Sequence, residues 1–467
     1  MGNDLLRARR ESLPSRLRPT ETMSRSELAE AVNAHVWATT GQRTTLDAHA
    51  IARYERGQSR WPGRQYRDGL RAVLGVETDA EIGFYRTKRG SAARDVGRLS
   101  TWDMDTLTGL TDLGSKFVDL TRRGLLGVAA YSAVATALPT DSWWSEMARR
   151  SAQRAAHGVR SVGRGDIEAV RESVTFFSRM DQRHGGGHAR AAAMQYLTDD
   201  VNRLLNGSFA SGTLRREMFS AASELAYVAG WMAFDNAEHG IAQGLFTSSV
   251  KLAAEAEDPA MAAHTLRAMA HQAIDLGHLT QGQELAAASV DGDRYEAATP
   301  RERALLGVVR ARALAATGQK SAATSALVQA ERDLTAATPG GDEPARVFFF
   351  GGASLAHETG NALRDIGDLA GAEQQLEHSV ATRKASAFKR THAVTLGYLA
   401  DVQARRGELE LACATWSTAL DAMDGVQSAR ARQTIVEMRS VLAMHKATNS
   451  DVAILDERAR AYLAATN

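Results

Sequence analysis

Hydrophobic residues spaced three and four positions apart predict a short amphipathic helix near the start of the chain. Leu28 and Val32 lie on such a stripe. Ser24 precedes it, and Glu27 occupies the third position of a capping box, in which each side chain accepts from the other residue's backbone N–H. We expect this helix to end at Asn33, because asparagine tolerates the left-handed conformation that follows many helices.

The same spacing predicts a second helix after a connection of 13 residues, 34–46. It should begin near Thr45 or Asp47, since either side chain can accept a backbone N–H, and run to Arg56. A capped helix, a turn and a second helix with a basic outer face fit the DNA major groove, which admits one helix between phosphates. Two ordinary amphipathic helices are the alternative. The residues turned inward would be Ala50, Ile51 and Tyr54.

Charge is divided unevenly along the chain. Its 467 residues include 56 Lys and Arg and 55 Asp and Glu, a formal net charge of +1. Residues 1–90 hold 16 basic and 11 acidic residues, net +5, so the remainder holds 40 and 44, net −4. The basic end is the end with the predicted helix pair, as expected for a nucleic-acid partner.

The pattern Ser-x-x-Glu-Leu-Ala from Ser24, followed by Ile-x-x-Tyr-Glu-x-Gly-x-x-x-x-Pro from Ile51, resembles the lambda-repressor-like helix-turn-helix of the xenobiotic-response-element (XRE) family. The resemblance covers residues 3–76. The connection 34–46 departs from the family's usual turn of about four residues. The resemblance implies that DNA is contacted by Ser24, Arg25 and Ser26 on the first helix and by Thr45, Asp47, Ala48, His49 and Arg53 on the second.

Four arginines follow the second helix closely. We expect them to contact phosphates rather than bases, because phosphate contacts position a reader along the duplex. Solvated surface charges are the alternative. These residues are Arg56, Arg60, Arg64 and Arg67.

Beyond residue 158 a turn signal recurs at steps of 40, 41, 49 and 40 residues. A small residue lies seven positions before each turn, and another lies five positions after it. The residue nine positions after the turn is bulky in most of the units. Small residues let two helices approach closely, so the pattern predicts stacked helical hairpins. A generic helical bundle is the alternative. The turns fall at Ala237, Gly277, Gly318, Gly367 and Gly407.

This pattern resembles tetratricopeptide-type repeats. The loops between repeats are longer than usual, because the period exceeds the typical value of about 34 residues. If the repeats stack, the first helix of each hairpin lines an inner face that is polar, charged and aromatic. We expect an open groove there that binds an extended peptide or another small ligand. A solvated surface without a ligand is the alternative. The expected ligand-binding residues are Tyr227, Trp231, Asp235, His264, Arg267, His271, Arg312, His357, Asn361 and Arg364.

The region between the two patterns is expected to be a linker with one or two short helices. A buried apolar helix over 127–138 would couple the domains. The preceding Thr-Arg-Arg-Gly-Leu-Leu looks like a twin-arginine export signal, yet it lies far from the start of the chain, and the apolar stretch is shorter than the roughly 20 residues that cross a bilayer. The segment His184-Gly-Gly-Gly-His188 should be a polar hinge rather than a metal site.

Enzymatic function is not expected. The sequence has no Gly-x-Ser-x-Gly nucleophile elbow and no Gly-x-x-x-x-Gly-Lys phosphate loop. Cys413 is the single cysteine, which excludes an internal disulfide and a cysteine-built zinc site and suits a reducing cytoplasm. We expect no cofactor and no metal, and the first residues lack the apolar core of a secretory signal.

The sequence thus predicts an all-α protein in three parts. These are a helix-turn-helix at 1–76, a linker and coupling helix at 77–157, and an α-solenoid of tetratricopeptide-like repeats at 158–467. This layout resembles the peptide-responsive RRNPP regulators and many actinobacterial regulators, and implies that a peptide or small-molecule effector alters affinity for double-stranded DNA. One reader covers a half-site, so we expect a cytoplasmic homodimer without membrane contact. An interaction scaffold without specific DNA binding is the alternative.

Overall fold

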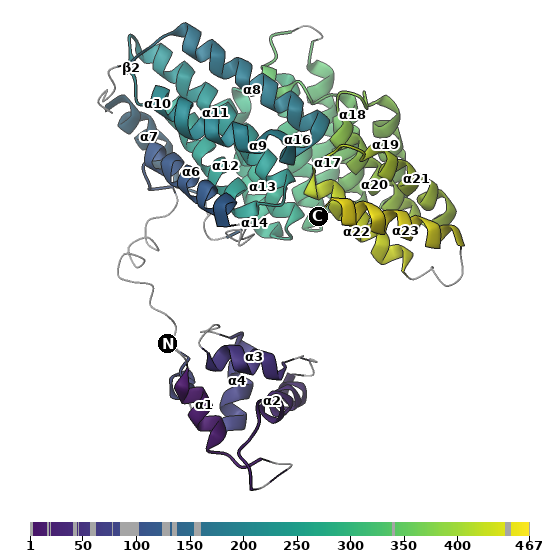
Figure 1. Cartoon of the computed structure of the whole chain (residues 1–467). Helices are drawn as coiled ribbons and strands as arrows, with labels where there is room; N and C mark the ends of the chain where they lie inside the picture. The colour runs from purple at the N-terminus through teal and green to yellow at the C-terminus, as the bar shows by residue number, and fades with distance from the viewer. Residues whose placement is uncertain are drawn as a thin grey trace. The chain divides into compact units, whose positions relative to one another are not determined.

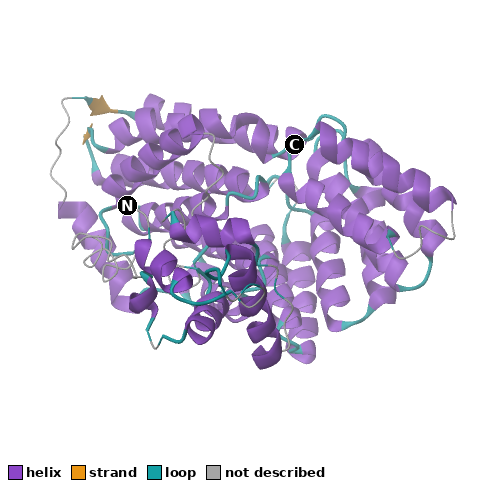
Figure 2. Ribbon diagram, turned by 60° about the horizontal axis from the view of Figure 1, so that its bottom comes forward, coloured by secondary structure: helices purple, strands orange, loops and turns teal. Residues whose placement is uncertain are grey.

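In a computed structural model of the chain, helices form nearly all of the regular structure (Figure 2). The structure describes residues 3–15, 18, 20–40, 44, 46–56, 62–76, 78–84, 102–123, 131–132, 138–153, 160–338, 341–443 and 450–466. Within these ranges the only strands are a parallel pair, β1 (Ser161–Val162) and β2 (Ser208–Phe209). The all-α class predicted from the sequence is confirmed. The chain divides into two compact units, residues 1–98 and 99–467.

The first unit, drawn in purple in Figure 1, has a small apolar core of its own. Leu28, Val32 and Ile51 are fully buried in it, and Ala50 and Tyr54 are nearly so, as the helical spacing predicted. The described helices of this unit are α1 (Asp4–Glu11), α2 (Arg25–Thr40), α3 (Ala48–Glu55), α4 (Arg64–Leu74) and the 3-10 helix η1 (Asp79–Ile82).

The first predicted helix begins where the sequence placed its start but ends later. Ser24 and Glu27 form the predicted capping box, with Glu27 N donating to Ser24 Oγ at 3.2 Å and Ser24 N to Glu27 Oε2 at 2.8 Å. The predicted end at Asn33 is wrong, because α2 continues to Thr40. The connection to α3 is therefore residues 41–47 and not 34–46.

Asn33 has a different role from the helix cap that the sequence suggested. Its Nδ2 donates to the carbonyl oxygen of Leu46 at 2.8 Å, and its Oδ1 accepts from Leu46 N at 3.0 Å and from Thr44 Oγ1 at 2.8 Å. The side chain thus holds the end of the connection against the middle of α2. Asp47 then caps α3 by accepting from Ala50 N at 2.7 Å.

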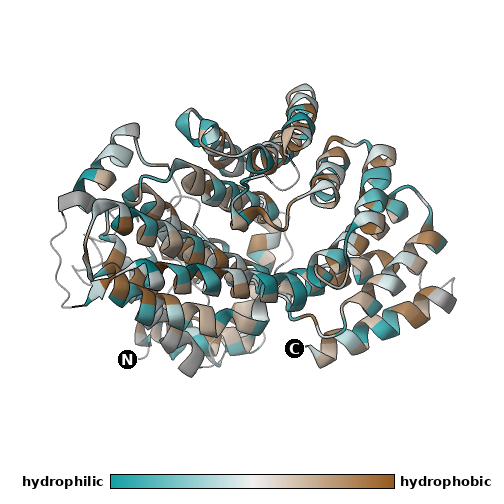
Figure 3. Ribbon diagram, turned by 90° about the horizontal axis from the view of Figure 1, so that it is seen from above, coloured by the Kyte–Doolittle hydropathy of each residue, from teal (hydrophilic) through white to brown (hydrophobic). Residues whose placement is uncertain are grey.

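The second unit is a series of antiparallel helices, running in Figure 1 from blue to yellow. In Figure 3 hydrophobic and hydrophilic residues alternate along most of them, as expected for helices with one buried face. Its described helices are α6 (Thr106–Arg123), α7 (Asp141–Gln153), α8 (Arg164–His184), α9 (Gly186–Gln195), the π-helix η3 (Tyr196–Val201), α10 (Asn202–Leu205), α11 (Gly212–Asp235), α12 (His239–Glu255), α13 (Pro259–Asp275), α14 (Leu279–Ser289), α15 (Asp293–Glu296), α16 (Pro300–Ala316), α17 (Lys320–Ala336), η4 (Ala345–Val347), α18 (Gly352–Ile366), α19 (Leu369–Thr382), α20 (Lys389–Arg405), α21 (Leu409–Ala422), α22 (Ala429–Leu442) and α23 (Ser450–Ala465).

Each of the five predicted turns joins two packed helices, in the pairs α11 and α12, α13 and α14, α16 and α17, α18 and α19, and α20 and α21. Small residues allow the close approach: a Cβ on Gly230 would lie 2.8 Å from the Phe246 ring, and one on Gly360 would lie 2.7 Å from Leu376. The turn residues all have positive φ, namely 60° at Ala237, 78° at Gly277, 78° at Gly318, 91° at Gly367 and 86° at Gly407.

The connection between α8 and α9 is a packed joint, so the hinge predicted for residues 184–188 is wrong. Gln427 N donates to the His184 carbonyl oxygen at 2.7 Å, and Gly187 N donates to the Gln427 carbonyl oxygen at 3.0 Å. A Cβ on Gly185 would lie 2.3 Å from that same Gln427 oxygen. Because α8 also packs against both α11 and α20, the early helices of the unit close onto its late ones.

The region before α8 is more helical than the loose linker predicted from the sequence, since α6 spans 18 residues and α7 spans 13. The coupling helix predicted over 127–138 falls mostly outside the described residues, and Tyr131 and Ser132, which are described, are not helical. Ser132 is held by Gln243 of α12 through two hydrogen bonds, and Tyr131 stacks on His278 at 4.8 Å.

Candidate functional site

The outer faces of α2 and α3 carry most of the predicted DNA contacts. Ser24, Arg25, Ser26, His49 and Arg53 are all exposed. The other predicted contacts divide into Asp47, which is exposed and caps α3, Ala48, which is half-buried, and Thr45, which lies outside the described residues. Two helices of the first unit therefore present polar side chains to solvent.

Arg25 has an internal partner that the sequence did not reveal. Its guanidinium lies 2.7 Å from Glu55, whose fully buried carboxylate also accepts from Arg10 Nε at 2.7 Å. Burial alone would raise the pKa of Glu55, but the hydrogen bonds from Arg10 and Arg25 outweigh it and lower that pKa. Arg25 thus ties the start of α2 to the end of α3, and its side chain remains partly exposed beside the predicted reading surface.

The arginines predicted to contact phosphates do not behave alike. Arg56 is exposed at the end of α3, and Arg64 is the first residue of α4. Arg60 lies outside the described residues. Arg67 is turned into the unit, where it pairs with Asp79 and donates through Nε to the Pro62 carbonyl oxygen at 3.0 Å. The phosphate contact predicted for Arg67 is not supported, because its guanidinium is used within the fold.

The inner face predicted as one open groove is mostly buried, which corrects the sequence-based expectation. The physical reason is that α8 and α22, which lie outside the five predicted hairpins, cover it together with α20. Trp231 and Arg364 are half-buried. The others are buried: Tyr227, Asp235, His264, Arg267, His271, Arg312, His357 and Asn361.

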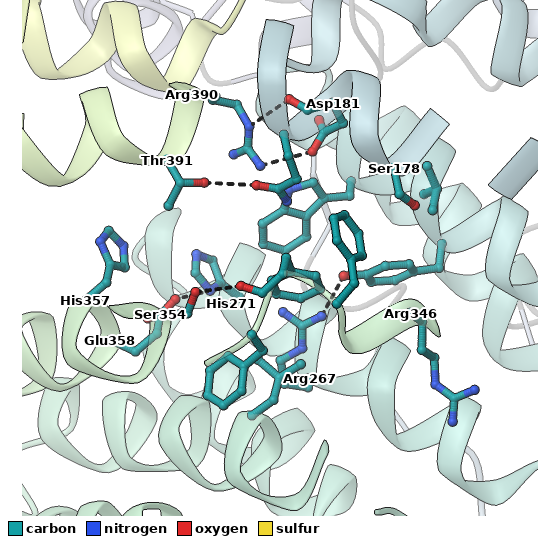
Figure 4. Close-up of a pocket in the computed structure, with 18 of the residues that line it drawn as sticks. Ser178, Asp181, Arg267, His271, Arg346, Ser354, His357, Glu358, Arg390 and Thr391 are labelled. Atoms are coloured by element: carbon teal, nitrogen blue, oxygen red, sulfur yellow. Dashed lines mark hydrogen bonds and ion pairs between the residues drawn. The ribbon is translucent and has the colours of Figure 1, made fainter. Parts of the chain in front are cut away.

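A cavity of about 80 Å³ lies among α8, α11, α13, α18, α20 and α22 (Figure 4). A polar cavity of roughly 10–15 Å³ holds one water, so this one has room for several waters or for a small ligand. The segment after η4 adds three aromatic side chains, Phe348, Phe349 and Phe350, to its lining. Five of the predicted ligand residues line it, namely Tyr227, Trp231, Arg267, His271 and His357.

The remaining predicted ligand residues lie elsewhere. Arg312 and Arg364 line a separate, open hollow of about 860 Å³. His264 is bound to Glu302 at 2.8 Å, and Asp235 is bound to Arg390 at 3.2 Å. Asn361 donates to a backbone carbonyl within its own helix. The structure thus divides the predicted face between two hollows and a set of buried structural contacts.

Six arginines lie at or beside the cavity, and four of them are paired with carboxylates. The shortest distances are 2.7 Å for Arg346 and Glu302, 3.0 Å for Arg390 and Asp181, 3.1 Å for Arg430 and Asp275, and 3.0 Å for Arg312 and Glu358. The other two, Arg267 and Arg383, are 2% and 8% exposed. No carboxylate of the described residues lies within 4.0 Å of either.

Burial shifts the ionisation of several groups at the cavity. It raises the pKa of Asp181 to about 6, even though Arg390 opposes the shift. It lowers the pKa of Arg383 to about 10 and that of His357 to about 3. His357 is therefore neutral at pH 7, with Nδ1 at 2.8 Å from Thr395 Oγ1. Charge at this cavity is consequently set by the arginines and the carboxylates.

Four arginines that line the cavity were missed by the repeat register. Arg383 directly follows α19, Arg390 is the second residue of α20, and Arg430 is the second residue of α22. Arg346 lies in the segment between α17 and α18, together with the three phenylalanines. One signal was available, since the step between turns lengthens from about 40 residues to 49 at this insertion.

Comparison with protein-family models gives no match, and comparison with curated proteins gives no similar sequence. No helix in the described ranges is long and apolar enough to cross a membrane. Across the same ranges, no three His, Cys, Asp or Glu side chains gather in a way that could hold a metal ion.

Proposed function

We propose that the chain is a sequence-specific DNA-binding transcription regulator. The observation that carries this proposal is the exposed face of α3, where His49 and Arg53 point away from a core built on Ile51 and Tyr54. A capped helix such as α3, which follows α2 in a small basic unit, suits the DNA major groove. In this proposal α2 and α3 are the two helices of a lambda-repressor-like reader.

The reader in this proposal is rigid before it meets DNA. Glu55 joins α3 to Arg10 of α1 and Arg25 of α2, so ion pairs connect all three helices. Asn33 fixes the connection ahead of α3. Preorganisation of this kind supports recognition, because less conformational entropy is lost on binding.

The second unit is proposed to be a tetratricopeptide-like solenoid that senses a ligand and modulates operator binding as a homodimer. The cavity beside Trp231 and Arg267 supports the sensing part, because it combines room with polar groups that lack protein partners. A ligand changes DNA affinity only if it binds the DNA-competent and incompetent states differently. The sensing part of the proposal therefore requires that ligand binding be thermodynamically linked to the equilibrium between the DNA-competent and incompetent states.

Salt dependence tests the DNA-binding proposal. The full chain is titrated with a fluorescent duplex carrying a selected site and with a random duplex, from about 50 to 200 mM salt. We expect tight binding to the selected site that weakens steeply with salt, because phosphate contacts release counterions. Equal, weak binding to both duplexes would instead favour the alternative of a protein-interaction scaffold.

A further inference from the structure

We propose that the cavity beside Trp231 binds a small organic monocarboxylate, with Arg267 and the Trp231 indole N–H holding its carboxylate. The inference deepens the proposed sensing function by naming the ligand class. It is carried by two buried donors without hydrogen-bond partners, on two side chains that line the same cavity, and it makes no use of DNA binding.

Arg267 is a buried cation whose hydrogen bonding is incomplete. Its Nη2 donates to the Tyr227 hydroxyl at 2.7 Å and lies 3.3 Å from His264 Nε2, while its Nε is buried without any partner (Figure 4). The Tyr227 and Trp231 rings lie 5.7 and 5.4 Å from the guanidinium, which offsets part of the cost of burying the charge. An anion would supply the missing acceptor and the missing countercharge.

Trp231 places a second unpaired donor on the same wall. Its Nε1 is buried and has no hydrogen-bond partner. Buried indole N–H groups usually find an acceptor, and leaving one unmade costs about 1–3 kcal/mol. The close packing of the Arg267 guanidinium on the Trp231 ring brings both side chains to one part of the lining.

Arg383 gives the cavity a further unpaired cation. Its guanidinium donates to the Ala353 carbonyl oxygen at 2.9 Å and to Ser379 Oγ at 3.0 Å, and its Nε is also buried without a partner. Glu358 lies near enough to act on it electrostatically but does not form an ion pair with it. The carboxylates around the cavity are therefore engaged by the other four arginines.

The lining also selects the type of anion. Asp181, Glu224 and Glu358 reach the same cavity, so a phosphate ester carrying nearly two charges would be repelled more strongly than a monoanion. The three phenylalanines after η4 and the neighbouring valines offer an apolar surface to the rest of the molecule. A volume of about 80 Å³ favours a small molecule over an extended peptide.

The test is calorimetric titration of the full chain, without DNA, with benzoate, phenylacetate and hexanoate. Each is compared with its uncharged amide, and phenyl phosphate forms a separate arm, all at up to about 10 mM. We expect saturable binding of at least one carboxylate and at least about tenfold weaker binding of its amide, because the amide lacks the charge that Arg267 requires.

Variants then locate the site. Arg267→Gln should weaken carboxylate binding by about tenfold or more, whereas Arg310→Gln, on the exposed face of α16, should leave it unchanged. Should Arg267→Gln fail to fold by circular dichroism, Trp231→Phe replaces it, since phenylalanine keeps an aromatic ring and removes only the N–H donor. We expect that variant to bind the carboxylate about threefold to tenfold more weakly.

Three results would overturn the proposal. They are no binding of any carboxylate in the panel, equal binding of a carboxylate and its amide, and carboxylate binding that Arg267→Gln and Trp231→Phe both leave unchanged. Stronger binding of phenyl phosphate than of every carboxylate would also overturn the ligand class. None of these results depends on DNA, so the fate of the DNA-binding proposal is decided separately.

Discussion

Arg390 on α20 and Asp181 on α8 form a buried ion pair at 3.0 Å, although 209 residues separate them in the sequence. Arg390 also reaches Asp235 on α11 at 3.2 Å. One guanidinium thus connects an early helix, the first hairpin and the last hairpin. Arg390 and Asp181 both line the cavity, so this contact helps to cover the face that was predicted to be open.

We expect Arg390→Met to lower the free energy of unfolding by about 3–5 kcal/mol, because it leaves Asp181 and Asp235 buried without their shared cation. Chemical denaturation followed by circular dichroism measures the loss. Arg405→Met is the matched control, since the Arg405 side chain is 54% exposed and its pair with Asp401 should be worth only about 0–1 kcal/mol. Similar losses in the two variants would show that the buried pair does not hold α8 to α20.

We expect the buried His357 to contribute to acid sensitivity of the second unit. Burial lowers its pKa in the folded state to about 3, below its ordinary 6.5, so the unfolded chain takes up a proton first as the pH falls. The stability it contributes is present above pH 6.5 and is lost as the pH falls toward 3, by up to about 1.4 kcal/mol per pH unit. His357→Gln should flatten the decline in unfolding free energy between pH 6.5 and 4. A variant with the wild-type pH profile would exclude His357 as the cause.

Gly185 is expected to be far less replaceable than the turn glycines. Its φ is +89°, and an added Cβ would lie 2.3 Å from the Gln427 carbonyl oxygen. Gly277 has a similar φ of +78° but nothing within 4 Å of an added Cβ. Gly277→Ala should therefore cost about 1–2 kcal/mol from the backbone alone, and Gly185→Ala should cost more because the packing must also shift. Equal melting temperatures for the two variants would argue against the packed joint.

Asn33→Ala should destabilise the first unit by about 1–3 kcal/mol, because buried groups of the connection before α3 lose their partners. Asn33→Asp keeps the acceptor for Leu46 N and Thr44 Oγ1 and should cost less. Differential scanning calorimetry of the full chain resolves the transition of this unit from that of the larger one. No change in that transition would mean that Asn33 does not order the connection.

Local sequence signals predicted much of the secondary structure and little of the long-range packing. The spacing of small residues located the five turns, since Gly277 and its counterparts need positive φ. Asn33 misled because its side chain can serve a helix end or a neighbouring loop, and only the tertiary contact with Leu46 decides between them. Local propensity does not encode such a choice.

Only part of the candidate cavity could be predicted, again because local sequence patterns do not encode long-range packing. Trp231, Arg267 and His271 follow from the periodicity of two repeat helices. Arg346 comes from an insertion between repeats, and Arg390 is tied to a helix that precedes the repeats. A register within repeats cannot predict which distant helix covers their inner face, so burial and charge pairing became visible only in the fold.

The central claim, sequence-specific DNA binding through α3, is tested most directly by sequencing the fragments that the purified full chain retains from a random duplex library. The account predicts one enriched motif for the wild type, and it predicts that Arg53→Ala binds that motif about 1–3 kcal/mol more weakly while its affinity for random DNA changes little. A retained pool with the base composition of the input library would contradict the account.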